Sequence, residues 1–197
     1  AAAIVAHEFI LYPKSRSIIG AFLSAYSQGT MDMVLANLNF LNANTEFRKQ
    51  RSPDTPDYIM ARYQIEVNKV KIWKGFHSVV QCFTFKDRPE AAVGKGCAWL
   101  VLDEAGIFPN ITATYGFTEP LILDGSTYTG NALVFGSSGN MDSGSKYFHE
   151  MFIQPSKYNM LEFVDPDNEQ KRIGYFSSAI KGRQGVCKNP NSKWFNQ

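Results

Sequence analysis

One apolar run in this chain ends abruptly in two adjacent carboxylates. Residues 97–102 read Cys-Ala-Trp-Leu-Val-Leu, and Asp103 and Glu104 follow directly, before Ala105 and Gly106. A buried strand of a parallel sheet reads as a near-continuous hydrophobic run, and open α/β sheets bind ligands beyond the carboxyl ends of such strands. Neighbouring side chains of a strand point to opposite faces, so adjacent acids share one site only where the strand ends and the chain turns. The run therefore predicts an α/β sheet with an acidic site at its carboxyl edge.

The two acids match the needs of one reaction. Hydrolysis of a phosphoanhydride requires an Asp that holds hydrated Mg²⁺ and a Glu that polarises a water, because the protein mainly positions the nucleophile and neutralises charge. We interpret residues 97–104 as a Walker B strand, with Asp103 at the metal and Glu104 as the catalytic residue. The implied cofactors are ATP and Mg²⁺.

The rest of the chain alternates between buried strands and helices. The patterns predict a strand at 17–23, a helix from 24 to about 49 capped by hydroxyls of Ser24 to Ser27, a polar loop at 51–57, β segments at 63–67, 70–73 and 78–85, a helical connection at 109–123, a strand at 131–135, a helix at 145–152 and strands at 158–164 and 173–180. This order predicts a mostly parallel sheet with helices on both faces and an antiparallel excursion at one edge.

A second polar loop lies about 30 residues after the acids, the length of one βαβ step. It reads Gly136-Ser137-Ser138-Gly139-Asn140 and closes the predicted strand 131–135. Parallel neighbours place both loops at the same sheet edge. Hydroxyls and an amide there could hydrogen-bond a terminal phosphate or the attacking water.

A nucleotide hydrolase also needs a phosphate-binding loop of the form GxxxxGK[ST], and the sequence has none. Gly94-Lys95 does not qualify, since Pro89 occupies the first glycine position and Gly96 the hydroxyl position. Residues 1–12 look like the back half of a buried helix that stops at Pro13. We therefore expect the P-loop and its strand to lie just before Ala1.

Composition narrows the alternatives. The net charge of +2 gives no global electrostatic argument for nucleic acid. The three cysteines, Cys82, Cys97 and Cys187, form no CxxC pair, which is typical of reduced thiols, and no zinc site is indicated. Nothing in the sequence reads as a signal peptide or a membrane span.

A basic and aromatic stretch offers a local surface for DNA. Its members are Arg62, Tyr63, Lys69, Lys71, Trp73, Lys74 and Phe76. The sequence alone favours the simpler interpretation, a solvated hairpin face.

Together these motifs resemble the ATPase half of the large terminase of tailed bacteriophages, the DNA-packaging motor. The matching pieces are the opening helix, the strand 17–23 with its serine-rich exit, Leu-Val-Leu-Asp103-Glu104-Ala105-Gly106, the strand ending in Gly136-Ser137-Ser138-Gly139, and the stretches 146–152 and 155–159. The resemblance spans residues 1 to about 179.

The resemblance implies roles for individual residues. Asp103 would coordinate Mg²⁺ through water, Glu104 would activate the hydrolytic water, and Ser137, Ser138, Gly139 and Asn140 would form a coupling loop that links hydrolysis to movement. It also implies a RecA-like P-loop NTPase fold of the ASCE class, of which residues 1–180 are a partial ATPase domain and 181–197 a tail toward an absent nuclease domain.

The implied partners belong to the full-length protein. They are double-stranded DNA, a portal protein, a small terminase subunit and further copies of the same chain in a ring, acting in the host cytoplasm and transiently at the prohead portal. We expect the 197-residue chain by itself to hydrolyse ATP poorly or not at all, because a P-loop supplies most backbone donors to the phosphates.

Two other functions remain open at this point. The chain could belong to another P-loop nucleic-acid motor such as a helicase core, or to a non-catalytic scaffold or binding domain in which Asp103 and Glu104 are a solvated strand end. An arginine that acts on the γ-phosphate is also expected, and Arg16, Arg48, Arg51 and Arg62 are equal candidates.

Overall fold

The computed structural model describes residues 1–137, 145–160, 162–164 and 171–173. Its helices and strands, with short 3₁₀ helices labelled η, are α1 (Ala2–Leu11), β1 (Arg16–Ala21), α2 (Ser24–Asn44), β2 (Arg51–Thr55), β3 (Tyr58–Ala61), β4 (Tyr63–Val67), β5 (Val70–Lys74), β6 (Val79–Thr84), β7 (Trp99–Asp103), η1 (Ala105–Ile107), α3 (Ile111–Thr118), η2 (Glu119–Ile122), β8 (Leu123–Asp124), β9 (Thr127–Tyr128), β10 (Asn131–Val134), α4 (Lys146–Ile153), η4 (Pro155–Tyr158), β11 (Glu162–Val164) and β12 (Lys171–Ile173). The chain divides into two compact units, Ala1–Ser145 and Lys146–Gln197.

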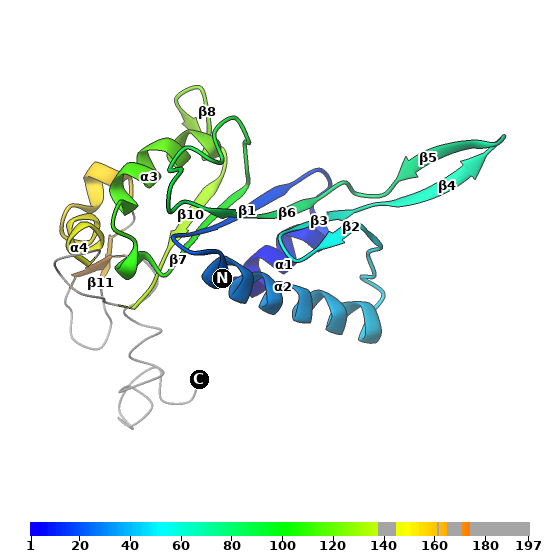
Figure 1. The fold of residues 1–197 in the computed structure, drawn as a ribbon, viewed down its shortest axis with the longest axis horizontal. Coiled ribbons are helices and arrows are strands. Elements are labelled where there is room, and N and C mark those ends of the chain that lie inside the picture. The colour runs from blue at the N-terminus through cyan, green and yellow to red at the C-terminus, as the bar shows by residue number, and fades with distance from the viewer. Residues whose placement is uncertain (138–144, 161, 165–170, 174–197) are drawn as a thin grey trace. The chain divides into compact units, whose positions relative to one another are not determined.

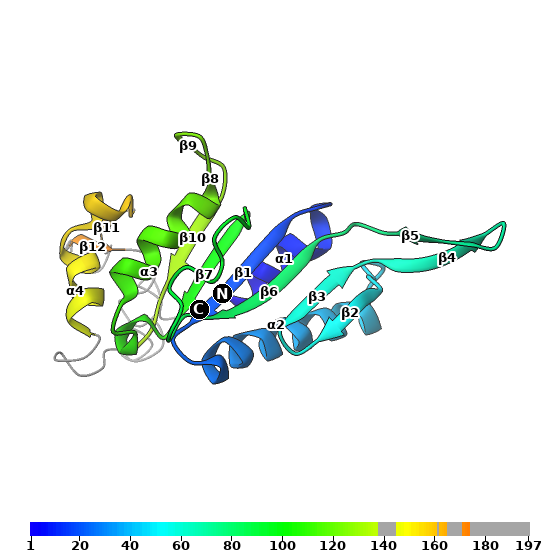
Figure 2. The same cartoon turned by 45° about the horizontal axis from the view of Figure 1, so that its top comes forward.

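A six-stranded sheet organises the first unit, in the order β10-β7-β1-β6-β3-β2 (Figures 1 and 2). The four strands β10, β7, β1 and β6 are parallel. β3 pairs antiparallel with β6, and β2 pairs antiparallel with β3. The predicted fold class, a mostly parallel sheet with an antiparallel excursion at one edge, is confirmed.

Helices α1 and α2 cover one face of this sheet. Alternate strand residues Ile19 and Val101 pack in one buried cluster with Val5 and Phe9 of α1 and Val34 of α2. The α1 segment was predicted to be buried, and five of its ten residues are. Apolar residues spaced three and four apart bury one stripe of each helix, which fixes both against the sheet.

The other sheet face holds the alternate strand residues. Ile18, Leu100 and Leu102 are fully buried there. A Cβ on Gly20 would lie 2.2 Å from the Phe85 ring and 3.0 Å from Leu102, so only glycine lets Phe85 sit on the strand. Phe85 stacks on Phe108 at 6.2 Å between ring centroids, and α3 lies on this side in both views (Figures 1 and 2). Helices therefore occupy both faces, as predicted.

A two-stranded ribbon, β4–β5, continues the pair β3–β6 beyond the sheet (Figure 1). The predicted turn residues Asn68 and Lys69 connect its strands, with φ of 52° and 63°. Two successive residues with positive φ are typical of the type I′ turn, whose twist matches that of a β-hairpin.

The structure corrects four local predictions. The proline-punctuated segment 51–57 contains the edge strand β2, because the register shifts between Arg51 and Asp54 and an edge strand tolerates a proline at such an irregularity. The helix predicted to reach about residue 49 ends at Asn44. Leu23 occupies its N-cap, and the Ser27 hydroxyl donates to the Ser24 carbonyl at 3.0 Å, so no serine caps it.

Part of the predicted strand 158–164 also differs, since Tyr158 closes the 3₁₀ helix η4 and β11 begins at Glu162. Residues 174–180 of the last predicted strand lie outside the described residues. No helix of the described chain combines the length and apolar character needed to cross a membrane.

The second unit contains α4, η4 and the antiparallel pair β11–β12. Lys157 pairs with Glu150 at 2.6 Å, and the Tyr158 hydroxyl donates to the same Glu150 oxygen at 2.8 Å. Both contacts tie η4 to α4.

Candidate functional site

Asp103 is the last residue of β7, at the carboxyl edge of the sheet. β7 lies between β1 and β10, so Asp103 stands in the interior of the sheet rather than at its side. Its side chain is buried, with 8% of the residue exposed. One carboxylate oxygen, Oδ2, accepts a hydrogen bond from the hydroxyl of Thr30 in α2, and the other, Oδ1, accepts one from the backbone N–H of Glu104 at 2.8 Å.

The pKa of Asp103 lies above its ordinary value. Burial is the main cause, and the charge of Glu104 adds to it. The hydrogen bonds from Thr30 and from the Glu104 backbone act in the opposite direction without reversing the shift. Asp103 is thus an acid whose ionised form gains from any cation placed beside it.

Glu104 turns the chain at the strand end. Its backbone is left-handed, with φ 52° and ψ 43°, a conformation that few residues other than glycine adopt. Because of this turn, the side chains of Asp103 and Glu104 no longer have to point to opposite faces of the sheet, as neighbouring strand residues do. Two adjacent acids can then take part in one site. Strained backbone of this kind gathers at functional sites.

Ser137 meets Glu104 from the neighbouring strand. The Ser137 hydroxyl donates to Glu104 Oε2 at 3.1 Å, across 33 residues of sequence. Backbone bonds hold the two strand ends in register, from Phe135 N–H to Leu102 at 3.0 Å and from Ala105 N–H to Phe135 at 2.8 Å. Glu104 and Ser137, at the ends of neighbouring strands, therefore lie side by side, as the sequence predicts.

Gly136 makes this approach possible. A Cβ at position 136 would lie 2.5 Å from the backbone nitrogen of Ala105 and 2.8 Å from Cα of Glu104. Real Cβ atoms do not come so close to backbone, so a side chain there would push the loops apart.

The polar side-chain atoms that meet at this edge, among the described residues, are all oxygens. Asp103, Thr30, Glu104 and Ser137 supply carboxylates and hydroxyls, the donors that Mg²⁺ prefers. No group of three or more His, Cys, Asp or Glu able to hold a metal occurs in the described part of the chain. Two carboxylates and two hydroxyls are oxygen ligands of the kind that bind an ion which keeps several waters and contacts substrate phosphates, as Mg²⁺ does.

Sequence reasoning missed Thr30. A signal was present, because Thr30 falls on the α2 stripe that also contains Ser27, Met31, Val34 and Leu38, all buried. A hydroxyl on an apolar helix stripe needs a buried partner, and the neighbouring strand ends in a carboxylate.

The other predicted site residues have different outcomes. Ser138, Gly139 and Asn140 lie outside the described residues. Of the candidate arginines, Arg16 begins β1 and Arg51 begins β2, both at the amino edge of the sheet, opposite Asp103. Arg62 follows β3 at the same amino edge, where its partner residue is Ser52. None of these three is at the acidic pair.

Comparisons with known proteins bear on the fold. No protein-family model and no curated protein matches this chain. Among solved structures, the large terminase ATPase domain of Thermus phage P74-26 matches in a mutant form with a TM-score of 0.57 and 18% identity, and in the unmutated form with 0.57 and 17%. The large terminase of bacteriophage HK97 matches with a TM-score of 0.48 and 11% identity, over 80% of this chain and 30% of that one.

The chain spans 58% of the length of the P74-26 domain, and 78% of this chain is covered. At this level of identity the likeness concerns the fold. The chain has a mostly parallel, helix-covered sheet similar to that of a phage large terminase ATPase domain.

Proposed function

We propose that this chain is part of the ATP-hydrolysing motor of a terminase-like protein. The observation that carries the proposal is the meeting of Asp103 and Glu104, at the end of a central strand, with Ser137 from the next strand. Such an edge of an open parallel sheet is where α/β proteins bind their ligands. The fold likeness to phage terminase ATPase domains supports this choice over a helicase core.

Each residue has a definite task in this proposal. Bound Mg²⁺ would neutralise charge on the nucleotide phosphates, and Asp103 would hold it through water. Thr30 keeps the Asp103 carboxylate in one orientation by donating to Oδ2. Glu104 would accept a proton from, and orient, the attacking water.

Ser137 acts as a positioning residue. Its hydroxyl fixes one oxygen of Glu104 and leaves the other, Oε1, for a water. A change in the phosphates that moves Glu104 would pull on the Ser137 loop, which is how the predicted coupling loop of Ser137, Ser138, Gly139 and Asn140 would sense hydrolysis. The reverse also holds, since a displaced loop would misplace the base.

In the whole protein the motor would move double-stranded DNA into a prohead, in a ring of identical subunits beside a portal protein and a small terminase subunit. The magnesium and nucleotide sites would need a P-loop, which this sequence lacks. The 197-residue chain alone is accordingly expected to show little turnover.

The test is magnesium-dependent ATP hydrolysis by the full-length protein that contains this chain. Glu104→Gln should lower kcat by about 10²–10⁴, the usual contribution of a general base, while nucleotide binding persists. Glu90→Gln, an equal change at an exposed acid, is the matched control and should leave kcat unchanged.

Ser137→Ala should lower kcat less than Glu104→Gln does, because the base remains and only its orientation is lost. Wild-type turnover by the Glu104→Gln protein would refute the proposal. Strong magnesium-dependent turnover by the isolated chain that Glu104→Gln abolishes would keep the role of Glu104, but it would contradict the expectation that a P-loop is needed.

A further inference from the structure

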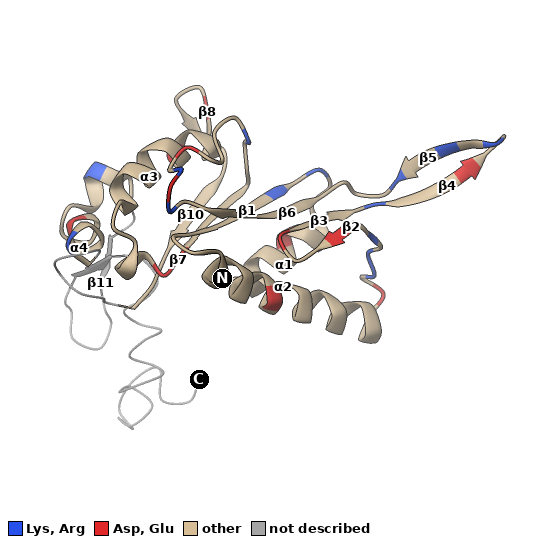
Figure 3. Cartoon of the chain, in the orientation of Figure 1, with Lys and Arg blue, Asp and Glu red and all other residues tan. Residues whose placement is uncertain are grey.

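Positive charge is concentrated in one segment of this chain. Residues 48–74 contain seven basic and three acidic side chains, a net charge of +4, whereas the whole chain carries +2. The remainder is therefore net negative. Figure 3 shows the basic residues on β5, at the tip of the β4–β5 ribbon and in the segment that leads into β2.

The β4–β5 ribbon has two unlike faces. Its register pairs Gln64 with Trp73 and Glu66 with Lys71, and alternation along each strand places these four on one face, the polar face. Trp73 is 40% exposed on it. The opposite face is mainly apolar and consists of Tyr63, Ile65, Val67, Val70 and Ile72, with Lys74 opposite Tyr63 at the base of the ribbon.

A cavity of about 540 Å³ opens where the base of the ribbon meets α2 and β2. We call it the basic cavity. Its lining combines three cations with aromatic and amide groups: Lys49, Arg51, Arg62, Asn42, Gln50, Ser52, Asp54, Tyr63, Gln64 and Trp73. Asp54 is its one acid.

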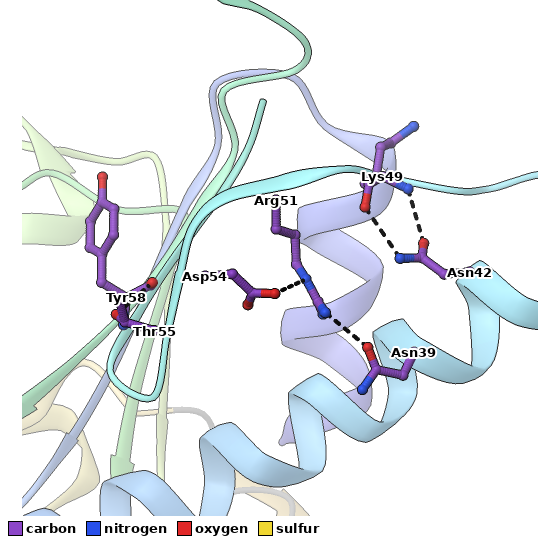
Figure 4. Close-up of polar contacts among 7 residues, drawn as sticks. All are labelled: Asn39, Asn42, Lys49, Arg51, Asp54, Thr55 and Tyr58. Atoms are coloured by element: carbon purple, nitrogen blue, oxygen red, sulfur yellow. Dashed lines mark hydrogen bonds and ion pairs between the residues drawn. The ribbon is translucent and has the colours of Figure 1, made fainter. Parts of the chain in front are cut away.

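Two cations of the basic cavity have no carboxylate partner in the described part of the chain. The Lys49 ammonium lies 3.8 Å from the centroid of the Phe76 ring, and its backbone, not its side chain, bonds to Asn42 (Figure 4). Arg62 donates from Nε to the Ser52 carbonyl at 2.6 Å and stacks 4.1 Å above the Trp73 ring. Its two terminal nitrogens have no hydrogen bond to any described residue.

Arg51 is only partly satisfied. Its Nε donates to Asp54 at 3.1 Å and its Nη2 to Asn39 at 2.9 Å, which holds the guanidinium against α2 (Figure 4). Its Nη1 is buried without a partner among the described residues. A buried guanidinium donor without an acceptor is costly, and an anionic oxygen in the cavity would lower that cost.

The ribbon lysines extend the cationic surface. Lys69, Lys71 and Lys74 are exposed, and none forms an ion pair with a described residue, although Glu66 stands opposite Lys71 in the register. Lys71 and Trp73 occupy the same face two positions apart, and the basic cavity begins at Trp73. Cations and an aromatic ring therefore follow one another from the ribbon tip to the cavity.

The geometry points to a nucleic-acid site in which the ribbon and the basic cavity bind the phosphodiester backbone of a DNA strand. Lys69 and Lys71 would contact successive phosphates along the polar face, and Lys74, opposite the cavity residue Tyr63, would contact a phosphate at the base of the ribbon. Lys49 and Arg62 would hold a phosphate at the cavity. The exposed Trp73 ring offers a stacking surface for a base or sugar, as in sequence-tolerant single-strand sites. A two-stranded ribbon also fits the major groove of a duplex.

The identification of the bound polyanion as DNA rests on the proposed function. The location of the binding site rests on the structure. The site is at the amino edge of the sheet, so it is separate from Asp103 and Glu104. DNA binding and ATP hydrolysis can consequently be tested independently.

The test is fluorescence anisotropy of the chain with a labelled mixed-sequence DNA duplex and with a labelled single strand, without nucleotide, over a range of salt. The ribbon variant is Lys69→Gln/Lys71→Gln/Lys74→Gln, and the cavity variant is Lys49→Gln. The matched control, Lys14→Gln/Lys86→Gln/Lys95→Gln, removes the same charge elsewhere in the first unit.

We expect the ribbon variant to weaken binding at low salt by about tenfold or more and to reduce the slope of log Kd against log salt by about 3, one per lost phosphate contact. Lys49→Gln should reduce the slope by about 1. The control should bind almost as wild type. The preferred probe, duplex or single strand, identifies the form of DNA.

Three results would overturn the inference. One is absence of DNA binding by the wild-type chain, and another is equal weakening by the control triple, which would indicate only net charge. The third is unchanged DNA binding in the ribbon variant together with altered self-association in Val67→Ser/Val70→Ser, which would assign the ribbon to a protein contact. Glu104→Gln should bind DNA normally, so failure of the ATPase proposal would appear separately.

Discussion

The Thr30 hydroxyl donates to Oδ2 of Asp103, and this buried hydrogen bond joins helix α2 to the end of β7 across 73 residues of sequence. Thr30 is 1% exposed and Asp103 8% exposed, so little water competes for either group. The helix that follows β1 thereby orients the acid that ends the adjacent strand. Packing and site geometry are coupled at this one contact.

Thr30→Val should destabilise the chain by about 1–3 kcal/mol, because it keeps the side-chain shape and leaves a buried carboxylate oxygen without its donor. The free energy of unfolding from urea titration measures the effect. Thr114→Val is the matched control, since the Thr114 hydroxyl is buried without a hydrogen-bond partner in the described structure. That change should be neutral or stabilising. Equal losses in both variants would mean that the Thr30 bond adds nothing.

Gly136→Ala should separate the two loops of the candidate site. The new Cβ would meet backbone atoms of Ala105 and Glu104 at 2.5 and 2.8 Å, and backbone cannot move aside as a flexible side chain can. We expect a loss of about 1–3 kcal/mol in the free energy of unfolding. In contrast, Gly116→Ala on the exposed side of α3 meets no atom within 4 Å and should stabilise by about 0.5–1 kcal/mol. Wild-type stability of Gly136→Ala would show that the loops separate freely.

The parallel sheet was predictable because its strands carry their own signal. Residues 97–102 are apolar throughout, and 17–23 and 131–135 contain no polar side chain after their first residue. A strand buried on both faces needs that composition. The edge strand β2 was not predictable, because Arg51, Pro53 and Asp54 lie in a half-exposed strand whose pairing with β3 overrides local preference. Helix ends were missed by a few residues where neither glycine nor a capping side chain marks them.

The acidic pair and its neighbouring loop were also predictable from spacing alone. Strand length and one βαβ step place Asp103, Glu104 and Ser137 at one edge, and the Ser137–Glu104 hydrogen bond follows from that proximity. Thr30 was harder to identify, because its contact depends on how α2 packs against β7. The basic and aromatic stretch from Arg62 to Phe76 was visible in the sequence, although the pattern alone favoured a solvated hairpin face. The basic cavity was not predictable, since it joins α2, β2 and the ribbon.

The stability contributed by Asp103 should depend on pH with a definite sign. The folded-state pKa lies above the ordinary value of 3.8, chiefly through burial, so the native state favours the protonated acid. That contribution is complete below the unfolded-state pKa and is lost as pH rises through the folded-state pKa. Asp103→Asn cannot ionise, and its amide oxygen can still accept from the Glu104 N–H.

The free energy of unfolding of Asp103→Asn, relative to wild type, should therefore increase from about pH 4 upward and then level off. Urea titrations at a series of pH values measure the difference. A difference that stays constant with pH, or falls as pH rises, would contradict the shift assigned to Asp103. Under the proposed function, the same variant should also lower magnesium-dependent ATP hydrolysis and raise the Mg²⁺ concentration that it requires.

Two thiols should be unreactive while the chain is folded. Burial raises the pKa of Cys97, which is 9% exposed, from 9.0 to about 12, and that of Cys82 to about 12 with smaller contributions from Asp57 and Asp32. The thiolate is the reactive form, so in a Cys187→Ser background a disulfide reagent at neutral pH should modify both thiols about a thousandfold more slowly than model thiols. Urea should restore ordinary rates.

The neutral thiols stabilise the fold fully below pH 9, and this contribution is lost as pH rises toward about 12. Immediate modification of both thiols in the native chain would contradict the burial of Cys97 before β7 and the half-buried position of Cys82 within β6.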